Sequence, residues 1–274
     1  MKIVQAGGQT CNQFWIYSNY IADCLERNES FSILVPDNSF VYYPNLLKSE
    51  FILLPLFSLR LSKICGVKNY LKILNLLLCN KYSLTFLKSV LNILPAVSFT
   101  VPDVHCPKSK FRVKHLHKLR SIFTPRQDIV SDVELTFEPI RRRYNVIVGV
   151  HIRYGDYRTF SGGRYFYKLE EYKSLVEKMI SLFPESKIAF FVASNENIAL
   201  SFFSNIDCFS LPNSSSIKDL YALGLCDYIL GAPSTFSAWA SLCGDVPLYF
   251  VENLNNDFDL DSFKRIQSTW LNHG

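Results

Sequence analysis

Apolar and polar residues occur along this chain in blocks that have the lengths of strands and helices. Short apolar runs rich in Val, Ile and Phe predict buried strands of a parallel sheet. In the second half of the chain they occupy residues 146–152, 187–193, 207–210, 228–231 and 247–251. Segments with apolar residues at helical spacing separate them, at 168–183, 195–203, 217–224 and from 234 onward. The alternation predicts an α/β fold built on a doubly wound sheet.

The first half opens with the pattern of a βαβ unit. An apolar strand at 1–6 and a strand at 32–35 flank a helix expected at 14–25, with two glycines between the first strand and the helix. Residues 100–145 are polar and basic, and we expect a helix over 128–143 before the next strand. We therefore place a domain boundary after residue 144, which divides the chain into domains 1–144 and 145–274.

The segment 46–99 is dense in Leu, Ile and Phe and is dotted with lysines. We favour helices that pack on the first domain. The alternative is a helical face, centred on residues 60–98, that rests on a membrane with its lysines at the headgroups. No uninterrupted apolar stretch reaches the roughly 18 residues of a membrane-spanning helix. No signal-peptide pattern precedes the first strand, so we expect a cytoplasmic protein, in contact with the inner face of the membrane if the alternative holds.

Composition and charge narrow the classes of ligand. The net charge is +5, and the basic residues form no continuous patch interleaved with aromatic residues, which argues against nucleic acid and suits anionic small ligands or an acidic membrane surface. The eight cysteines occur singly, without a CxxC pair. This spacing predicts free thiols in a reducing compartment and no structural zinc site, and we expect no metal cofactor.

Candidate chemistry gathers where the strand at 146–152 ends. His151, Arg153 and Asp156 follow one another there, with Gly155 at the turn. Open α/β sheets bind ligands beyond the carboxyl ends of their strands. An arginine at that place can grip two phosphate oxygens, and a histidine can contact a sugar or a base. Asp156 either holds Arg153 in place or accepts a proton, and the sequence leaves both roles open.

Two further segments carry polar residues next to predicted strands. Gly8 and Asn12 lie between the first strand and its helix, where a ligand could approach the backbone, although a tight turn before a capped helix explains them equally well. Asp227 precedes the strand at 228–231 and could accept two hydrogen bonds from a guanine edge or cap a turn. Ser234 and Thr235 open the next helix, as an anion site or as a helix cap.

Taken in order, these segments resemble the α-1,2-fucosyltransferases and the wider set of GDP-fucose-dependent transferases. Residues 8–13 resemble the family's Gly-rich GNQ loop, and residues 151–157 resemble its HxRRGDY motif. Phe191–Asn195 is similar to a strand that ends in Ser-Asn, and residues 219–240 resemble the motif that ends in Ser-[ST]-Phe-x-x-Trp-Ala. Tyr154 stands where the family has a second arginine, which removes a positive charge and leaves room for another donor sugar.

The resemblance implies a GT-B-like architecture of two Rossmann-like domains that face each other across a cleft. Domain 1–144, with a helical insertion, would receive the acceptor, and domain 145–274 would hold the nucleotide sugar. The activity implied is an inverting, metal-independent transfer of fucose from GDP-fucose to a hydroxyl of an oligosaccharide or lipid-linked glycan, in α-1,2 linkage. The alternatives are transfer from a different nucleotide sugar and a non-catalytic glycan-binding or membrane-binding relative.

The same resemblance assigns residues to these roles. Arg153 and Asp156 would take part in catalysis, with Glu170 and Glu171 as the next candidates for the base. The residues expected to contact the donor are Gly8, Asn12, His151, Arg153, Ser194, Asp227, Ser234, Thr235 and Phe236.

Overall fold

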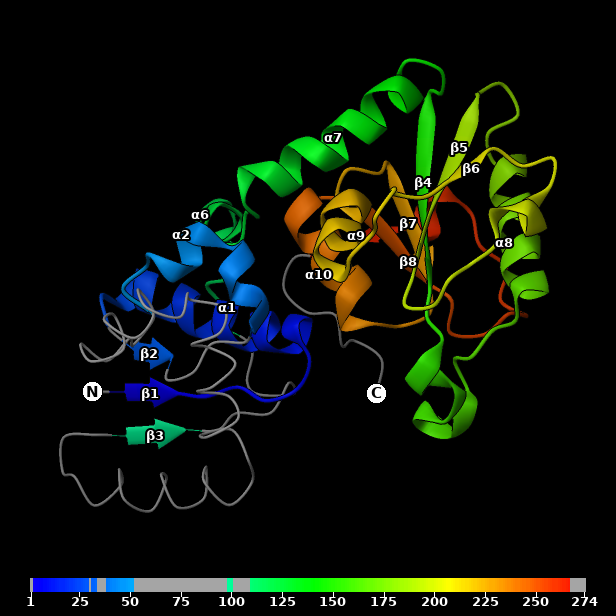
Figure 1. Cartoon of the computed structure of the whole chain (residues 1–274). Coiled ribbons are helices and arrows are strands. Elements are labelled where there is room, and N and C mark those ends of the chain that lie inside the picture. Colours follow the sequence, from blue (N-terminus) through cyan, green and yellow to red (C-terminus); the bar gives the residue numbers. More distant parts are fainter. Residues whose placement is uncertain (1, 30, 34–37, 52–97, 101–108, 267–274) are drawn as a thin grey trace. The chain divides into compact units, whose positions relative to one another are not determined.

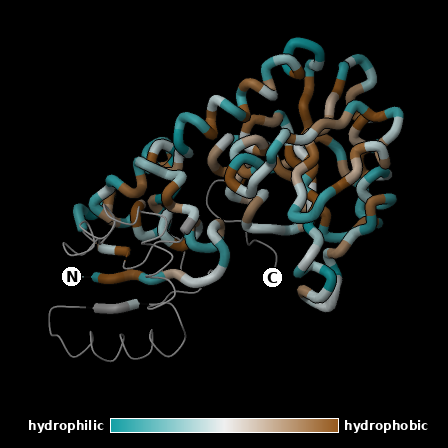
Figure 2. The backbone as a smooth tube through the Cα atoms, in the orientation of Figure 1, coloured by the Kyte–Doolittle hydropathy of each residue, from teal (hydrophilic) through white to brown (hydrophobic). Residues whose placement is uncertain are grey.

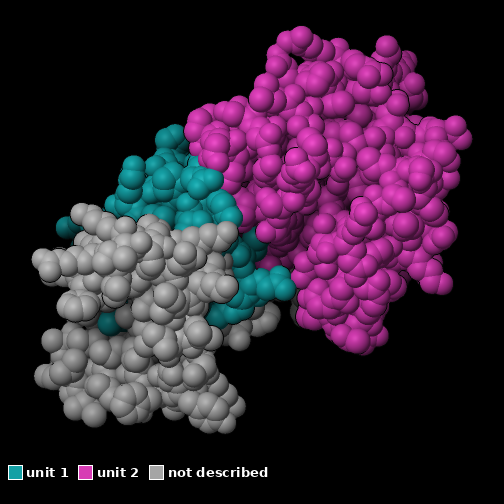
Figure 3. Space-filling model, viewed as in Figure 1, with its two compact units in different colours: residues 1–126, 267–269 teal, residues 127–266, 270–274 magenta. Residues whose placement is uncertain are grey.

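The computed structural model describes residues 2–29, 31–33, 38–51, 98–100 and 109–266 (Figure 1). These residues form two compact units, of which one extends through Arg126 and the other runs from Gln127 to Ile266 (Figure 3). The division lies before helix α7 (Gln127–Arg141), whereas the sequence placed it after that helix. The reason is packing, because Phe137 of α7 contacts the rings of Phe191 and Phe209 in the sheet of the second unit. The proposed membrane-facing segment 60–98 lies almost entirely outside the described residues.

The first unit contains the expected βαβ arrangement. Three short parallel strands lie in the order β2 (Phe31–Ile33), β1 (Lys2–Val4), β3 (Ser98–Thr100). Helix α1 (Thr10–Arg27) follows β1 and begins earlier than the sequence predicted. Strand β3 was not predicted, because three residues show no periodicity and its pairing with β1 joins distant parts of the chain.

Helix α1 supplies much of the core of the first unit. Its Phe14 side chain is fully buried and contacts the rings of Phe40, Tyr43 and Phe123. The remaining elements that the structure describes in this unit are short: η1 (Asn38–Tyr42), α2 (Pro44–Leu47) and α6 (Leu116–Ile122).

The second unit is a six-stranded sheet in the order β6-β5-β4-β7-β8-β9. The strands in chain order are β4 (Val146–Ile152), β5 (Ile188–Ser194), β6 (Cys208–Phe209), β7 (Tyr228–Gly231), β8 (Pro247–Phe250) and β9 (Lys264–Arg265). The first five pair in parallel, and β9 pairs antiparallel with β8. The residues of β4 itself are mostly apolar, and hydrophilic residues occupy the loop before it (Figure 2). The five parallel strands were predicted and are confirmed, whereas the two-residue strand β9 was not.

The helices of the second unit also follow the predicted alternation. They are α7, α8 (Leu169–Ser181), α9 (Ser216–Leu223) and α10 (Thr235–Gly244), with short 3₁₀ turns η2 (Gly155–Arg158), η3 (Phe160–Gly163), η4 (Leu200–Phe203) and η5 (Leu260–Ser262). The helix expected over 195–203 is wrong, since only the turn η4 forms there. Among the described residues, none of the helices combines the length and apolar character needed to cross a membrane.

The strand order creates a switch point beside β4. Strands β5 and β6 extend the sheet on one side of β4, and β7 and β8 extend it on the other. His151 of β4 lies level with Gly231 of β7. A Cβ atom at Gly231 would lie 2.5 Å from the carbonyl oxygen of His151, so this close pairing requires glycine. The crevice beyond the carboxyl ends of β4 and β7 is the place where open α/β sheets bind ligands.

Candidate functional site

His151 is a buried, uncharged side chain at the end of β4. Its ring stacks on that of Phe236, with the centroids 5.0 Å apart and the planes at 29°. Burial, assisted by the charge of Arg153, lowers the pKa of His151 to about 3. The imidazole is therefore neutral at physiological pH. Its buried Nδ1 atom has no hydrogen-bond partner among the described residues, which leaves that nitrogen available to a ligand.

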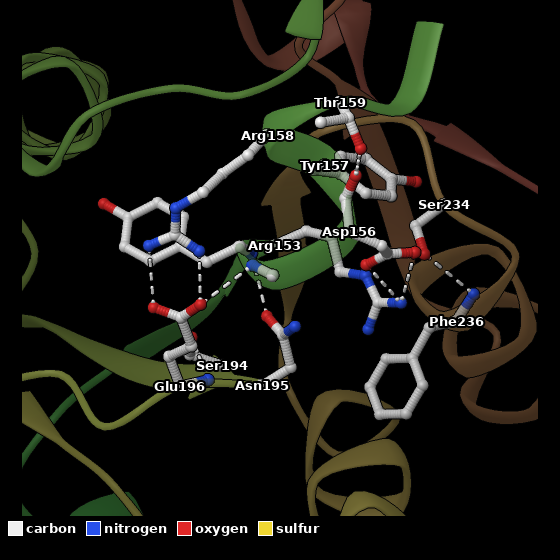
Figure 4. A network of polar contacts seen from close by, with 12 residues as sticks. Arg153, Asp156, Tyr157, Arg158, Thr159, Ser194, Asn195, Glu196, Ser234 and Phe236 are labelled. Carbon is white, nitrogen blue, oxygen red and sulfur yellow. Dashed lines mark hydrogen bonds and ion pairs between the residues drawn. The ribbon is translucent and has the colours of Figure 1, made fainter.

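Arg153 is held from two directions, and the side chain is only 15% exposed. Its Nη2 atom lies 2.9 Å from Oδ1 and 3.1 Å from Oδ2 of Asp156. The guanidinium carbon lies 5.5 Å from the centroid of the Tyr157 ring. Arg153 extends toward Asp156 on the side of the site where Ser234 and Phe236 lie (Figure 4). Because both contacts restrict the side chain, the guanidinium group is already held in one position before a ligand binds.

The turn after Arg153 is held by hydrogen bonds to the residues that follow β5. The backbone N–H of Tyr154 donates to Oδ1 of Asn195 at 2.8 Å, and that of Gly155 donates to Oε1 of Glu196 at 2.9 Å. Figure 4 shows the side chains of Asn195 and Glu196 at this turn, and the Glu196 carboxylate also forms an ion pair with Arg158. Gly155 has a φ of +61°, which favours glycine at this turn. Asn195 and Glu196 thus position the β4 tip.

The sequence analysis gave Asn195 and Glu196 no role, although both follow a predicted strand at the expected ligand-binding edge. It placed Ser194 against the donor instead. In the structure the Ser194 hydroxyl accepts a hydrogen bond from the backbone N–H of Glu196 at 3.1 Å. Ser194 therefore shapes the loop that supports Arg153.

The segment after β7 brings the next group of predicted residues to the same place. The Ser234 hydroxyl accepts a hydrogen bond from the backbone N–H of Phe236 at 3.1 Å, so Ser234 is the cap of α10. The Tyr157 hydroxyl donates to the carbonyl oxygen of Pro233 at 2.5 Å and ties the two loops together. Thr235 begins α10, whose positive amino-terminal end therefore lies beside the β4 tip. The fold thus brings Ser234, Thr235 and Phe236 to the same place as His151 and Arg153.

Asp227, which the sequence analysis placed against guanine, does not join this group. It lies just before β7, where its carboxylate forms an ion pair with Arg141 and accepts a hydrogen bond from the backbone N–H of Ile147 at 2.7 Å. That is the amino edge of the sheet, about 13 Å along β4 from His151 at some 3.3 Å per residue. The signal was in the sequence, because a residue that precedes a parallel strand lies at the edge opposite to one that follows it.

Comparison with known proteins identifies the family. The sequence model of glycosyl transferase family 11 matches residues 86–270, which is more than half of the chain. The chain belongs to glycosyl transferase family 11. It is therefore a glycosyltransferase enzyme. Among curated proteins, none matches it in sequence.

Solved structures similar to this family 11 transferase are fucosyltransferases. A mutant of FUT1 from Arabidopsis thaliana in complex with GDP gives a TM-score of 0.56 at 12% identity, covering 96% of this chain and 73% of that one. POFUT1 in complex with GDP-fucose gives a TM-score of 0.55 at 11% identity, covering 89% of this chain and 94% of that one. The fucosyltransferase NodZ from Bradyrhizobium gives a TM-score of 0.55 at 15% identity, covering 93% of this chain and 96% of that one. At such identities the likeness concerns the fold, and it confirms the GT-B-like α/β class with two Rossmann-like units.

A buried carboxylate that the sequence analysis overlooked lies at the ligand-binding edge of this transferase. Asp219 is in the first turn of α9, and because α9 follows the parallel strand β6, its first turn lies at the carboxyl edge. The Ser214 hydroxyl donates to Oδ1 of Asp219 at 2.6 Å. Burial raises the pKa of Asp219 to about 6, against the opposing effects of Ser214 and Lys218. Its position at the start of a helix after a strand was the signal that could have found it.

The two glutamates named as further base candidates begin helix α8. Oε2 of Glu171 accepts a hydrogen bond from the backbone N–H of Lys168 at 2.6 Å and so closes the first turn of the helix. Glu170 lies in the same turn and is exposed. Nothing in these contacts connects either carboxylate with Arg153.

Gly8 and Asn12 belong to the first unit and form one turn. Gly8 has a φ of +82°, and a Cβ atom there would lie 2.8 Å from Nδ2 of Asn12. Nε2 of Gln13 donates to the carbonyl oxygen of Gly8 at 3.1 Å. The turn follows β1 and leads into α1, so it occupies the carboxyl edge of its own sheet. This local geometry requires glycine and lets a ligand approach the backbone closely.

The described part of the chain contains no group of three His, Cys, Asp or Glu side chains placed to hold a metal ion. Cys24, Cys208 and Cys226 carry the free thiols expected from the sequence.

Proposed function

We propose that this transferase moves fucose from GDP-fucose to a hydroxyl of a glycan acceptor, with inversion and without a metal ion. The observation that carries the proposal is Arg153, held at the switch point of the second sheet beside the amino-terminal end of α10. The similar structures support the donor, because they are fucosyltransferases whose printed complexes contain GDP or GDP-fucose.

The arrangement suits the departure of a diphosphate. Sugar transfer passes through an oxocarbenium-like state while negative charge grows on the leaving group. A guanidinium that is already oriented, together with the free amides at the start of α10, stabilises that charge without reorganisation. His151 is neutral and lies against Phe236, so its unpaired nitrogen can accept or donate one hydrogen bond to the nucleotide without adding charge.

Asp156 acts first as the group that positions Arg153. Both of its carboxylate oxygens contact the same guanidinium nitrogen, which supports this role ahead of proton transfer. Its side chain is 52% exposed, so it also has an open face toward an approaching acceptor hydroxyl. We retain it as the candidate base, since the contacts of Glu171 commit that residue to a helix cap.

We assign the guanine contact to Asp219 in place of Asp227. Guanine presents two adjacent N–H donors on its pairing edge, and a carboxylate accepts both. Uracil, cytosine and adenine lack two adjacent donors there. Burying Asp219 disfavours its charged form, and a base that donates two hydrogen bonds would offset that cost.

The donor is tested by thermal shift with GDP, UDP, CDP and ADP. GDP should give the one large increase in melting temperature, and GDP-fucose should be consumed when a glycan acceptor is added. Asp219→Asn should weaken GDP binding by roughly tenfold or more, since an amide accepts one of the two hydrogen bonds and opposes the other. Wild-type binding of GDP should fall as the pH drops through about 6, where Asp219 gains a proton, and Asp219→Asn should lose that pH step.

Equal shifts with UDP or CDP would overturn the choice of GDP, and no shift with any nucleotide would overturn the proposed donor site.

A different sugar on the same nucleotide is the second candidate. The observation in its favour is Tyr154, which is buried and packs in a tilted arrangement against the ring of Phe166 where the resemblance expects an arginine. Hydrolysis of GDP-mannose in preference to GDP-fucose would establish that candidate.

The finer features remain proposals that rest on the resemblance. We propose an α-1,2 linkage, an oligosaccharide or lipid-linked glycan as the acceptor, and a cytoplasmic location at the inner face of the membrane. A linkage analysis of the product by NMR and fractionation of cells that express the full chain would test them.

A further inference from the structure

We propose that the loop after β4 binds the acceptor, with the exposed ring of Phe160 packed against the apolar face of a hexopyranose. The inference rests on the proposed function, because it takes the acceptor to be a glycan. It adds a subsite in the second unit, which the sequence analysis treated as the donor side alone.

Phe160 is exposed, although it belongs to an ordered aromatic group. It is 52% exposed, and the other exposed large apolar residues that the structure describes are Val113 and Leu135. Its ring stacks on that of Tyr157, with the centroids 5.1 Å apart and the planes at 25°. The Tyr157 ring also lies 5.5 Å from the guanidinium carbon of Arg153. A sugar packed on Phe160 would therefore lie in the same group of side chains as Arg153, the residue proposed to hold the diphosphate.

The backbone holds this stack in place. Tyr157 is buried, and its hydroxyl donates to the carbonyl oxygen of Pro233. After Phe160 the chain turns sharply, since Ser161, Gly162 and Gly163 have φ values of 51°, 68° and 79°. A left-handed conformation at a serine costs free energy and is kept where the surroundings demand it. In Figure 1 this segment extends beyond the carboxyl end of β4, which is the edge that carries the other site residues.

The chemistry of the loop fits a sugar better than an extended apolar partner. A pyranose offers a face of C–H groups to an aromatic ring and hydroxyls to the groups around it. Thr159, Ser161 and Arg164 are exposed beside Phe160 and supply hydrogen-bond donors. A protein or membrane partner needs a contiguous apolar patch of a few hundred Å². Val113 and Leu135 lie on other elements, so the described residues provide a single ring with polar neighbours.

The test uses the full chain and GDP-fucose, with acceptors drawn from lactose, N-acetyllactosamine, cellobiose and a glycan array. The measured quantity is the ratio of transfer to hydrolysis of GDP-fucose at subsaturating acceptor, together with the KM for the acceptor. Phe160→Ala should raise that KM about tenfold or more and lower the ratio by a similar factor, which is at the lower end of the effect that loss of an aromatic platform has on bound nucleic-acid bases. Phe160→Trp and Phe160→Tyr should keep both values near those of the wild type.

Leu135→Ala is the matched control, because Leu135 is 68% exposed on helix α7 and its truncation should leave both values unchanged. An unchanged acceptor KM in Phe160→Ala would overturn the subsite. So would a wild-type enzyme that hydrolyses GDP-fucose but uses no glycan in the panel. A wild-type chain that neither binds GDP nor hydrolyses GDP-fucose would instead overturn the proposed function, so the two failures are distinguishable.

Discussion

At the scale of single residues, the site combines a neutral histidine with a fixed positive charge. His151 is buried and is uncharged at physiological pH. Arg153 is a permanent cation that contacts the carboxylate of Asp156 and the ring of Tyr157. The difference in charge follows from burial. A protonated His151 would be a second positive charge, out of contact with water and close to Arg153, so the neutral form is favoured. The arginine is therefore the residue on which turnover should depend most.

Arg153→Ala should lower kcat by roughly a hundredfold or more, as the loss of one donor to a developing charge does in other enzymes. The fold should survive, because the side chain lies at a strand tip and not in the core. Arg142→Ala, at an exposed arginine that pairs with Glu138 on α7, is the control for removal of a charge. Steady-state kinetics and circular dichroism on the three proteins decide the matter. A wild-type rate in Arg153→Ala would remove this residue from the mechanism.

At the scale of elements, the ends of β4 and β5 form one unit. The backbone of the β4 turn donates to the side chains of Asn195 and Glu196, and Glu196 also pairs with Arg158. The turn therefore does not set its own conformation, since the neighbouring strand supplies its acceptors. A displacement of about 1 Å at a reacting group can cost a large factor in rate, so the clamp matters even though it touches no reacting atom.

Glu196→Ala should lower kcat about tenfold while the affinity for GDP changes less, because the turn that directs Arg153 loses an acceptor and an ion pair. Glu138→Ala is the matched control, since it breaks the exposed ion pair between Glu138 of α7 and Arg142, the residue after the helix. Glu196→Gln should recover part of the activity, as its amide oxygen can still accept from Gly155. The positioning role would be refuted by equal rates in Glu196→Ala and the wild type.

At the scale of the whole molecule, two units each place a glycine-containing turn after a strand of a parallel sheet. Gly8 follows β1 in the first unit, and Gly155 follows β4 in the second. In the proposed mechanism, Arg153 and the start of α10 in the second unit supply the positive charge for the leaving diphosphate. The proposal therefore predicts how the enzyme responds to removal of metal ions.

Incubation with EDTA should leave transfer within about twofold of the untreated rate, because Arg153 and helix amides can supply the positive charge that a divalent ion supplies elsewhere. The measurement is the initial rate of GDP release before and after chelation, with Mg²⁺ and Mn²⁺ added back. A loss of activity that either ion restores would contradict the metal-independent mechanism.

The sequence by itself determined the elements and the chemistry at their ends. Val- and Ile-rich runs with helical segments between them predicted the five parallel strands, because burial on both faces leaves a continuous apolar pattern. His151 and Arg153 became candidates because they stand at the end of such a run, and Ser234 because it opens the helix that follows another. The sequence order also places Asp227 and Asp219 at opposite edges of the sheet. Asp227 comes just before a parallel strand, whereas Asp219 begins the helix that follows one.

Only the tertiary structure decided what those residues contact. The strand order that puts β7 beside β4 creates the crevice, and no periodicity reports strand order. The acceptors at Asn195 and Glu196 come from a neighbouring strand some 40 positions away along the chain. The stacking of Phe160 on Tyr157, whose ring also lies near Arg153, likewise depends on the conformation of the loop after β4. The periodicity of a sequence predicts whether a side chain is buried. The residues that this side chain contacts depend on which distant segments pack together when the chain folds.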